Sequence, residues 1–143
     1  MRKRWILLSA VTVMITACTS PQQKKVNTLK EEAIALHDEV MPRMGELSEL
    51  SAEIKSMRDA VKTDTSANAQ ASTQTMTMQI KALEDAHEAM MEWMAEYEPM
   101  YDQEHHVDSA VAYYTQQKQE IGRVKKAMEK SIEDAKRYLG KGE

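Results

Sequence analysis

The sequence predicts an all-α protein, an antiparallel three-helix bundle that follows a signal peptide and a short tether. Three observations lead to this prediction. Apolar residues recur at helical spacing over three long segments, and Ala, Glu, Lys, Met and Gln, which favour helices, are abundant. Gly and Pro are few, with 4 and 3 residues among 143. Short polar stretches separate the three segments, which favours antiparallel packing of neighbouring helices.

The first predicted helix covers about residues 24–62 and follows a heptad repeat with Val26 at position a. Its a and d positions hold Val26, Leu29, Ala33, Leu36, Val40, Arg43, Leu47, Leu50, Ile54, Met57 and Val61. Pro42 lies inside this repeat and lacks a backbone N–H, so we expect a bend near residues 38–45. Arg43, the one charge at these positions, is expected to reach solvent at the bend or to pair with a carboxylate of another helix.

The second predicted helix covers about residues 73–97 and the third about residues 106–139, with residues 63–72 as a loop or frayed helix end. The apolar face of the second holds Met76, Ile80, Leu83, His87, Met90, Met94 and Tyr97. The apolar face of the third holds Val107, Val111, Tyr114, Ile121, Val124, Met128, Ile132, Ala135 and Leu139. The strict seven-residue period of the first helix also leaves open a longer coiled coil that oligomerises. We therefore expect a monomer or a weak homo-oligomer.

The N-terminus has the layout of a bacterial export signal. Three basic residues precede an uncharged, largely aliphatic run over residues 5–17, which is shorter than the roughly 20 residues of a spanning helix. The run ends Ile15-Thr16-Ala17-Cys18, which resembles the lipobox of bacterial lipoproteins. The resemblance implies cleavage before Cys18, a diacylglyceryl group on its sulfur and acylation of the new amine with a chain such as palmitate. We thus predict a signal peptide over 1–17, a lipidated tether over 18–25 and a helical domain over 26–143.

Cys18 is the only cysteine, so no disulfide, c-type haem attachment or cysteine-based zinc site can form within the chain. The predicted signal carries three of the 19 basic residues and none of the 23 acidic ones. The mature chain would therefore hold 16 basic residues against 23 acidic ones, a formal charge of −7. This balance argues against nucleic acid or an anionic lipid surface as a partner.

Methionine is unusually frequent, with ten residues after the predicted cleavage site, and phenylalanine is absent. In an antiparallel bundle, residues equally far from a turn lie at the same level on the two neighbouring helices. This packing would bring several of these methionines to one end of the bundle, together with Trp93, Tyr97 and histidines. The candidate ligands of a soft-metal site there are His37, Met41, Met44, Met90, Met94 and His106. Thioether and imidazole groups suit copper(I). The alternative is that methionine fills the core in place of phenylalanine.

Other candidate sites are weaker. Glu104, His105, His106 and Asp108 offer a divalent-cation site, against the alternative of an exposed polar loop. His87 is expected to be a buried neutral histidine, and a b-type haem between Met and His has little room in so small a bundle. Enzyme motifs are absent, so we expect no catalytic activity and no cofactor, with copper as the one alternative.

Two stretches, His37–Gly45 (HDEVMPRMG) and Asp85–Met94 (DAHEAMMEWM), resemble a group of small, largely uncharacterised Bacteroidetes lipoproteins. Some of these are labelled "viral A-type inclusion protein" for their likeness to coiled coils. Gln119–Val124 is similar as well, so the resemblance covers most of the mature chain. It implies a family and no reaction. In such bacteria acidic residues just after the lipidated cysteine favour display on the cell surface, and residues 19–25 contain none.

The sequence therefore predicts a lipid-anchored helical protein on the periplasmic face of the outer membrane. Its expected role is structural, or the binding of an envelope protein partner, without catalysis. A copper-binding lipoprotein is the alternative function.

Overall fold

A computed structural model describes residues 20–61, 63–64 and 66–142, and this part of the chain is helical without strands. Its elements are α1 (Pro21–Val40), the 3-10 helix η1 (Met41–Arg43), α2 (Met44–Ala60), α3 (Ala67–Glu96), α4 (Tyr101–Glu104) and α5 (Val107–Tyr138). The predicted signal over 1–17 and the predicted lipidation site Cys18 lie outside the described residues.

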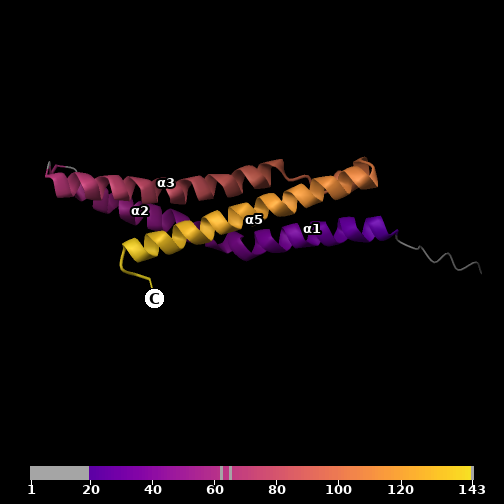
Figure 1. The fold of residues 1–143 in the computed structure, drawn as a ribbon, viewed down its shortest axis with the longest axis horizontal. Helices are drawn as coiled ribbons and strands as arrows, with labels where there is room; N and C mark the ends of the chain where they lie inside the picture. The colour runs from indigo at the N-terminus through magenta and orange to yellow at the C-terminus, as the bar shows by residue number, and fades with distance from the viewer. Residues whose placement is uncertain (1–19, 62, 65, 143) are drawn as a thin grey trace, which may run out of the picture.

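The helices form an elongated bundle, and the predicted fold class is confirmed (Figure 1). α1, η1 and α2 follow one another as a single bent rod, α3 returns along it, and α5 runs back beside α3. α1 packs mainly against α5, while α2 packs mainly against α3. α3 and α5 also pack against each other, so these two long helices join the two halves of the bent rod.

The bend lies where the sequence predicts it. Val40 leaves ideal helical geometry at φ −105° and ψ −21°, and η1 follows with Pro42 inside it. The N–H of Met44 donates to the carbonyl of Met41, three residues back, instead of the usual four. Because proline removes one hydrogen bond of the helix, the chain forms a tighter 3-10 turn at this point, and the axis of α2 differs in direction from that of α1.

α1 begins at Pro21, which makes residues 21–25 of the predicted tether helical. The hydroxyl of Ser20 accepts a hydrogen bond from the backbone N–H of Gln23 at 3.1 Å, and Pro21 occupies the first helical turn. A serine cap followed by proline is a strong helix start, because each satisfies or removes an N–H that would lack a partner.

α3 begins at Ala67, six residues before the predicted start, so the predicted loop over 63–72 is too long. The hydroxyl of Ser66 accepts from the N–H of Ala69 at 3.2 Å, and the Asp64 carboxylate accepts from the N–H of Ser66 at 2.9 Å. The small polar residues that suggested a loop contain this cap, and several alanines after it extend the helix by a turn and a half.

The core follows the predicted heptads closely in the first half of the chain. The a positions Val26, Ala33, Val40, Leu47 and Ile54 are all buried. Met57, a predicted core residue at a d position, is an exception to this pattern, since its side chain is 43% exposed. Lys141 pairs with Glu53, so α5 ends at Tyr138 before it reaches the level of Met57. α5 therefore does not cover Met57, and its seam position is exposed.

The buried face of α3 differs from the prediction in its second half. Met76, Ile80, Leu83 and Met90 are buried as predicted, but Ala86 and Trp93 are buried where His87 and Met94 were expected. α3 packs against both α2 and α5, and two of its buried positions, Ala86 and Trp93, lie one residue before the predicted ones. His87 is half-buried and lines a depression between α2 and α3 with Leu83 and Ser51.

A ladder of ion pairs fixes α5 against α1 and α2. The acidic partners, Glu32, Glu39, Glu46 and Glu53, are seven residues apart. They bind Lys118, Lys125, Lys136 and Lys141 with N–O distances of 2.8, 2.6, 2.5 and 2.5 Å. The paired residues are 86 positions apart in the first two pairs, 90 in the third and 88 in the last. A nearly constant separation means that α5 runs parallel to the first rod.

Glu46 also accepts a hydrogen bond from the Arg43 guanidinium at 3.1 Å, within one turn of the same chain segment. Arg43 therefore pairs locally, and the expectation that its partner comes from another helix is wrong. The bend turns the Arg43 side chain toward the start of α2, while Lys136 of α5 approaches the same carboxylate. The Lys136 hydrogen bond is the main cause that lowers the pKa of Glu46 below its ordinary value.

Reversal of one pair tests the ladder. We expect Glu39→Lys to lower the free energy of unfolding by about 0.5–1 kcal/mol, because Lys125 would then face a like charge. Lys125→Glu alone should have a larger effect, because Lys125 also pairs with Glu129, and the double reversal should recover only the part of the loss that comes from the Glu39 contact. Urea denaturation of the four proteins measures the coupling. Additive losses in the double variant would show that Glu39 and Lys125 do not interact.

Candidate functional site

The strongest concentration of functional side chains lies at one end of the bundle, which we call the aromatic end. It comprises the first turns of α1 and α5 and the connecting segment 97–106, which contains α4 (Figure 1). A small separate core holds it together, with Val26, Ala110 and Tyr114 fully buried. Residues from α1, α4 and α5 pack around these three, so this end is an ordered part of the bundle and not a loose loop.

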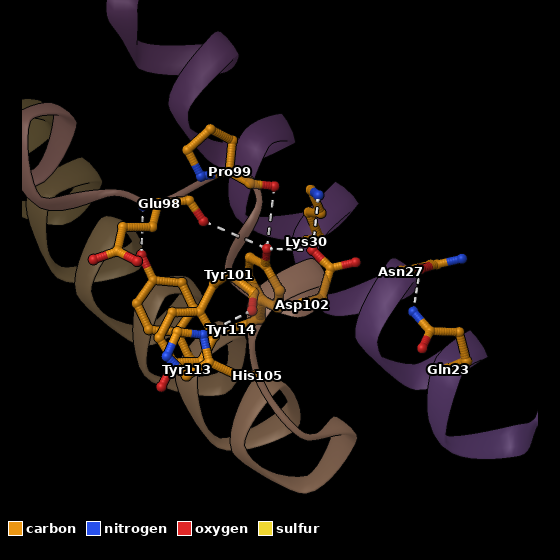
Figure 2. Close-up of polar contacts among 10 residues, drawn as sticks. All are labelled: Gln23, Asn27, Lys30, Glu98, Pro99, Tyr101, Asp102, His105, Tyr113 and Tyr114. Atoms are coloured by element: carbon orange, nitrogen blue, oxygen red, sulfur yellow. Dashed lines mark hydrogen bonds and ion pairs between the residues drawn. The ribbon is translucent and has the colours of Figure 1, made fainter.

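Seven aromatic rings form a continuous column from the last turn of α1 to this end. In order they are His37, Trp93, Tyr97, Tyr114, Tyr113, Tyr101 and His105. Successive ring centroids are 5.5, 4.8, 6.3, 5.1, 4.1 and 3.8 Å apart. Figure 2 shows the outer part of the column, where Tyr101, Tyr113 and His105 stack. Each contact contributes stability beyond burial alone, so the column connects α1, α3, α4 and α5.

A polar network closes the same end. The Tyr114 hydroxyl donates to Asp102 Oδ1 at 2.8 Å, and Lys30 Nζ donates to the same oxygen at 3.1 Å (Figure 2). The carbonyl oxygens of Pro99 and Glu98 lie 3.2 and 3.4 Å from the Tyr114 hydroxyl. One fully buried tyrosine thus fixes the segment between α3 and α4, and Asp102 joins it to α1.

The ionisation of these groups follows from their surroundings. Burial raises the pKa of Tyr97 to about 12. Burial, together with the hydrogen bond to Asp102, also raises the pKa of Tyr114. Burial by itself would raise the pKa of Asp102, but the hydrogen bonds from Tyr114 and Lys30 outweigh it and lower that pKa. At neutral pH both tyrosines are therefore protonated, and the Tyr114 hydroxyl donates to Asp102, which is a charged acceptor.

Removal of Asp102 is expected to loosen the aromatic end. Asp102→Ala leaves the Lys30 ammonium unpaired and takes the charged acceptor from the buried Tyr114 hydroxyl, which should cost about 1–3 kcal/mol of unfolding free energy. Glu104→Ala is the matched control, because Glu104 is an exposed residue of the same short helix. Thermal or urea unfolding measures both variants.

The same variant predicts a pH dependence. The folded-state pKa of Asp102 is lower than its unfolded value of about 3.9, so its contribution is present above that pH and is lost as the pH falls through the folded pKa. The stability difference between wild type and Asp102→Ala should therefore shrink below about pH 4. A difference that stays constant from neutral pH to about pH 2 would exclude a role for the carboxylate charge.

Four buried polar atoms make no hydrogen bond within the described part of the chain: Ser51 Oγ, Trp93 Nε1, Tyr97 Oη and Gln117 Oε1. Trp93 and Tyr97 are neighbours in the column. Ring stacking and apolar packing against the core therefore hold these two side chains.

The predicted copper ligands lie in different environments. Met90 is fully buried in the main core, Met44 and Met94 pack at its edge, and Met41 is 38% exposed. His37 Nδ1 lies 2.9 Å from Asp38 Oδ1, and the His37 ring stacks on Trp93. The heights estimated from the sequence put His37 level with Tyr97, and the structure instead stacks it on Trp93, one helical turn away.

His106 is exposed and caps α5 without a side-chain hydrogen bond. Across residues 20–61, 63–64 and 66–142, no three His, Cys, Asp or Glu side chains come close enough together to hold a metal ion. Methionine sulfurs are a different ligand class, so copper(I) binding stays a prediction from the sequence.

Sequence reasoning missed Asp102, Lys30 and the short helix α4. The connection between Glu98 and His106 was predicted only as a short link, and nothing in its spacing indicates that Asp102 binds a lysine 72 residues away. The ladder of ion pairs could have been predicted from the sequence, because four glutamates recur at one heptad position of the first helix and so form one acidic row along it.

Comparison of the chain with protein-family models, with curated proteins and with solved structures finds no match. The resemblance to Bacteroidetes lipoproteins therefore remains a prediction from the residues quoted for it.

Proposed function

We propose that this chain is a lipid-anchored helical protein of the cell envelope that binds a partner protein and catalyses no reaction. The anchor is Cys18, at the end of a lipobox-like sequence that follows a basic and then an apolar segment. This sequence feature carries the proposal. The proposed location is the periplasmic face of the outer membrane.

The short distance in sequence between Cys18 and the first helix supports a lipid anchor. In the described residues no helix combines the length and the apolar character needed to cross a membrane. Ser20, which caps α1, is only two residues after Cys18. An acyl anchor at Cys18 would hold the rigid bundle directly at the membrane surface.

The exposed apolar side chains support a role in protein binding. Every large hydrophobic residue that is exposed in the described chain is a methionine, and these are Met41, Met57, Met78, Met91 and Met100. Methionine is flexible and polarizable, so it adapts to the surface of a partner. Met41 and Met91 belong to the two stretches on which the resemblance rests, so we place the partner contact there.

Photo-crosslinking in intact cells tests this function. A photoreactive amino acid at Met91 should capture a discrete envelope protein, identified by mass spectrometry. The same residue at Met78, which is similarly exposed and lies on the same helix, is the matched control. Capture of the same proteins at both positions, or of none at either, would contradict the proposed contact.

A further inference from the structure

We propose that the aromatic end of the bundle lies against the zwitterionic phospholipid headgroups of the membrane and that Met100 enters this interface. This inference rests on the proposed lipid at Cys18 and adds an orientation to it. The lipid would then hold the domain at the surface, and the protein side chains of one end would set which face it presents to the membrane.

Chain length places the anchor beside this end. Consecutive Cα atoms are about 3.8 Å apart, so the Cα of Cys18 lies no more than about 8 Å from that of Ser20. Ser20 is the first residue before α1. Acyl chains on Cys18 would therefore enter the bilayer next to the first turn of α1.

α5 begins at the same level as α1. Lys118 pairs with Glu32 and Lys125 with Glu39, each across 86 positions. The same separation places Val107, the first residue of α5, level with Pro21, the first residue of α1. In Figure 1 the start of α1, the end of α3 and the start of α5 lie toward one end, and the turn between α2 and α3 lies at the other.

Met100 lies close to this level and projects into solvent. Tyr101 stacks on Tyr113, six residues or about 9 Å along α5 from Val107. At 60% exposure, Met100 is the most exposed of the large hydrophobic residues of the described chain. A tilt of the bundle toward α4 would lower this side chain into the headgroup region.

The segment that carries Met100 is held rigidly. The Tyr113 hydroxyl accepts from the N–H of Glu98 at 2.6 Å, and the Tyr114 hydroxyl lies within hydrogen-bond distance of the carbonyl of Pro99. Because the backbone around Met100 is already ordered, it loses little conformational entropy when the side chain enters the membrane interface. The partly exposed Tyr101 and Tyr113 beside it suit the membrane interface, because each offers an apolar ring and a polar hydroxyl.

The charges of this end favour a zwitterionic surface. Exposed Lys24 and Lys25 of α1 lie at the same end as three exposed acidic residues, Glu98 and Glu104 of the connecting segment and Asp108 of α5. A surface with both signs gains little from an anionic membrane. Contact through apolar and aromatic groups should therefore be insensitive to salt.

An environment-sensitive fluorophore tests the contact. The lipidated protein has its only cysteine sulfur blocked by the lipid, so Met100→Cys introduces a single site for a thiol-reactive nitrobenzoxadiazole dye. Met78→Cys is the matched control, because Met78 is 58% exposed and lies on α3 about 27 Å from the end of that helix. Both labelled proteins are reconstituted into phosphatidylcholine–phosphatidylethanolamine vesicles that contain a headgroup spin-labelled lipid.

We expect a several-fold stronger quenching of the dye at position 100 than at position 78, unchanged by added salt. Equal quenching at the two positions would show that the bundle lies on its side, and no quenching at position 100 would show that this end stays clear of the lipid. Either result overturns the proposed contact. Flotation of the same vesicles reports the anchor separately. Proteins that float without quenching contradict only the orientation, whereas proteins that fail to float contradict the lipid anchor as well.

Discussion

Replacement of Cys18 by serine is expected to move the protein from the membrane fraction to the soluble fraction of the envelope. Each buried CH₂ contributes about 0.8 kcal/mol to membrane binding, and two or more acyl chains give stable anchoring. Serine offers no thiol for the lipid, so the whole of this contribution would be lost. Because Cys18 precedes the bundle, the soluble variant should keep its helical circular dichroism and its unfolding midpoint.

Ser20→Ala is the matched control for this substitution. It removes the cap of α1 two residues away and should cost about 0.5–2 kcal/mol of stability. The control protein should remain in the membrane fraction, even after a wash with high salt. A Cys18→Ser protein that stayed in that fraction after the same wash would mean that another part of the chain is the anchor.

Met90→Ala is expected to lower the free energy of unfolding by about 2–5 kcal/mol. Met90 is 0% exposed and belongs to the main core, where it packs among residues of α1, α2 and α5. Truncation removes its transfer free energy and leaves a cavity that the long helices can fill only in part. A loss of this size is a large fraction of the stability of a domain of this length.

Met91 provides the control for that experiment, since it is the next residue of the same helix and is 49% exposed. Met91→Ala should change the stability by no more than about 0.5 kcal/mol. Urea denaturation followed by circular dichroism measures both variants. Similar losses for the two substitutions would contradict the assignment of Met90 to the core, and would require a different rotation of α3.

The helices and the bend could be predicted because their signals are local. The a positions from Val26 to Ile54 repeat with a period of seven, and Pro42 interrupts the hydrogen bonding of the helix that contains it. The burial of the a positions through Ile54 and the 3-10 turn at Met41–Arg43 confirm both predictions. The early start of α3 was missed because Ser66 and several alanines were assigned to the loop instead of to a capped helix.

The aromatic end was predicted in part. The predicted antiparallel packing gathered His37 with Trp93 and Tyr97, and the His37 and Trp93 rings stack with centroids 5.5 Å apart. The contacts of Asp102 and the packing of α3 against both α2 and α5 depend on how the three long helices cross in space, which no single segment encodes. For the same reason Trp93 is buried and Met94 only partly so, although the period of α3 alone favoured Met94.

The lipid anchor at Cys18 is the central claim, and the mass of the N-terminal peptide of the mature protein tests it most directly. Protein extracted from membranes with detergent is digested with trypsin, and its N-terminal peptide is sequenced by mass spectrometry. We predict a peptide that begins at Cys18, with a diacylglyceryl group on sulfur and an acyl chain on the amine. A peptide that contains Ala17 joined to Cys18, or one with an unmodified cysteine thiol, would contradict it.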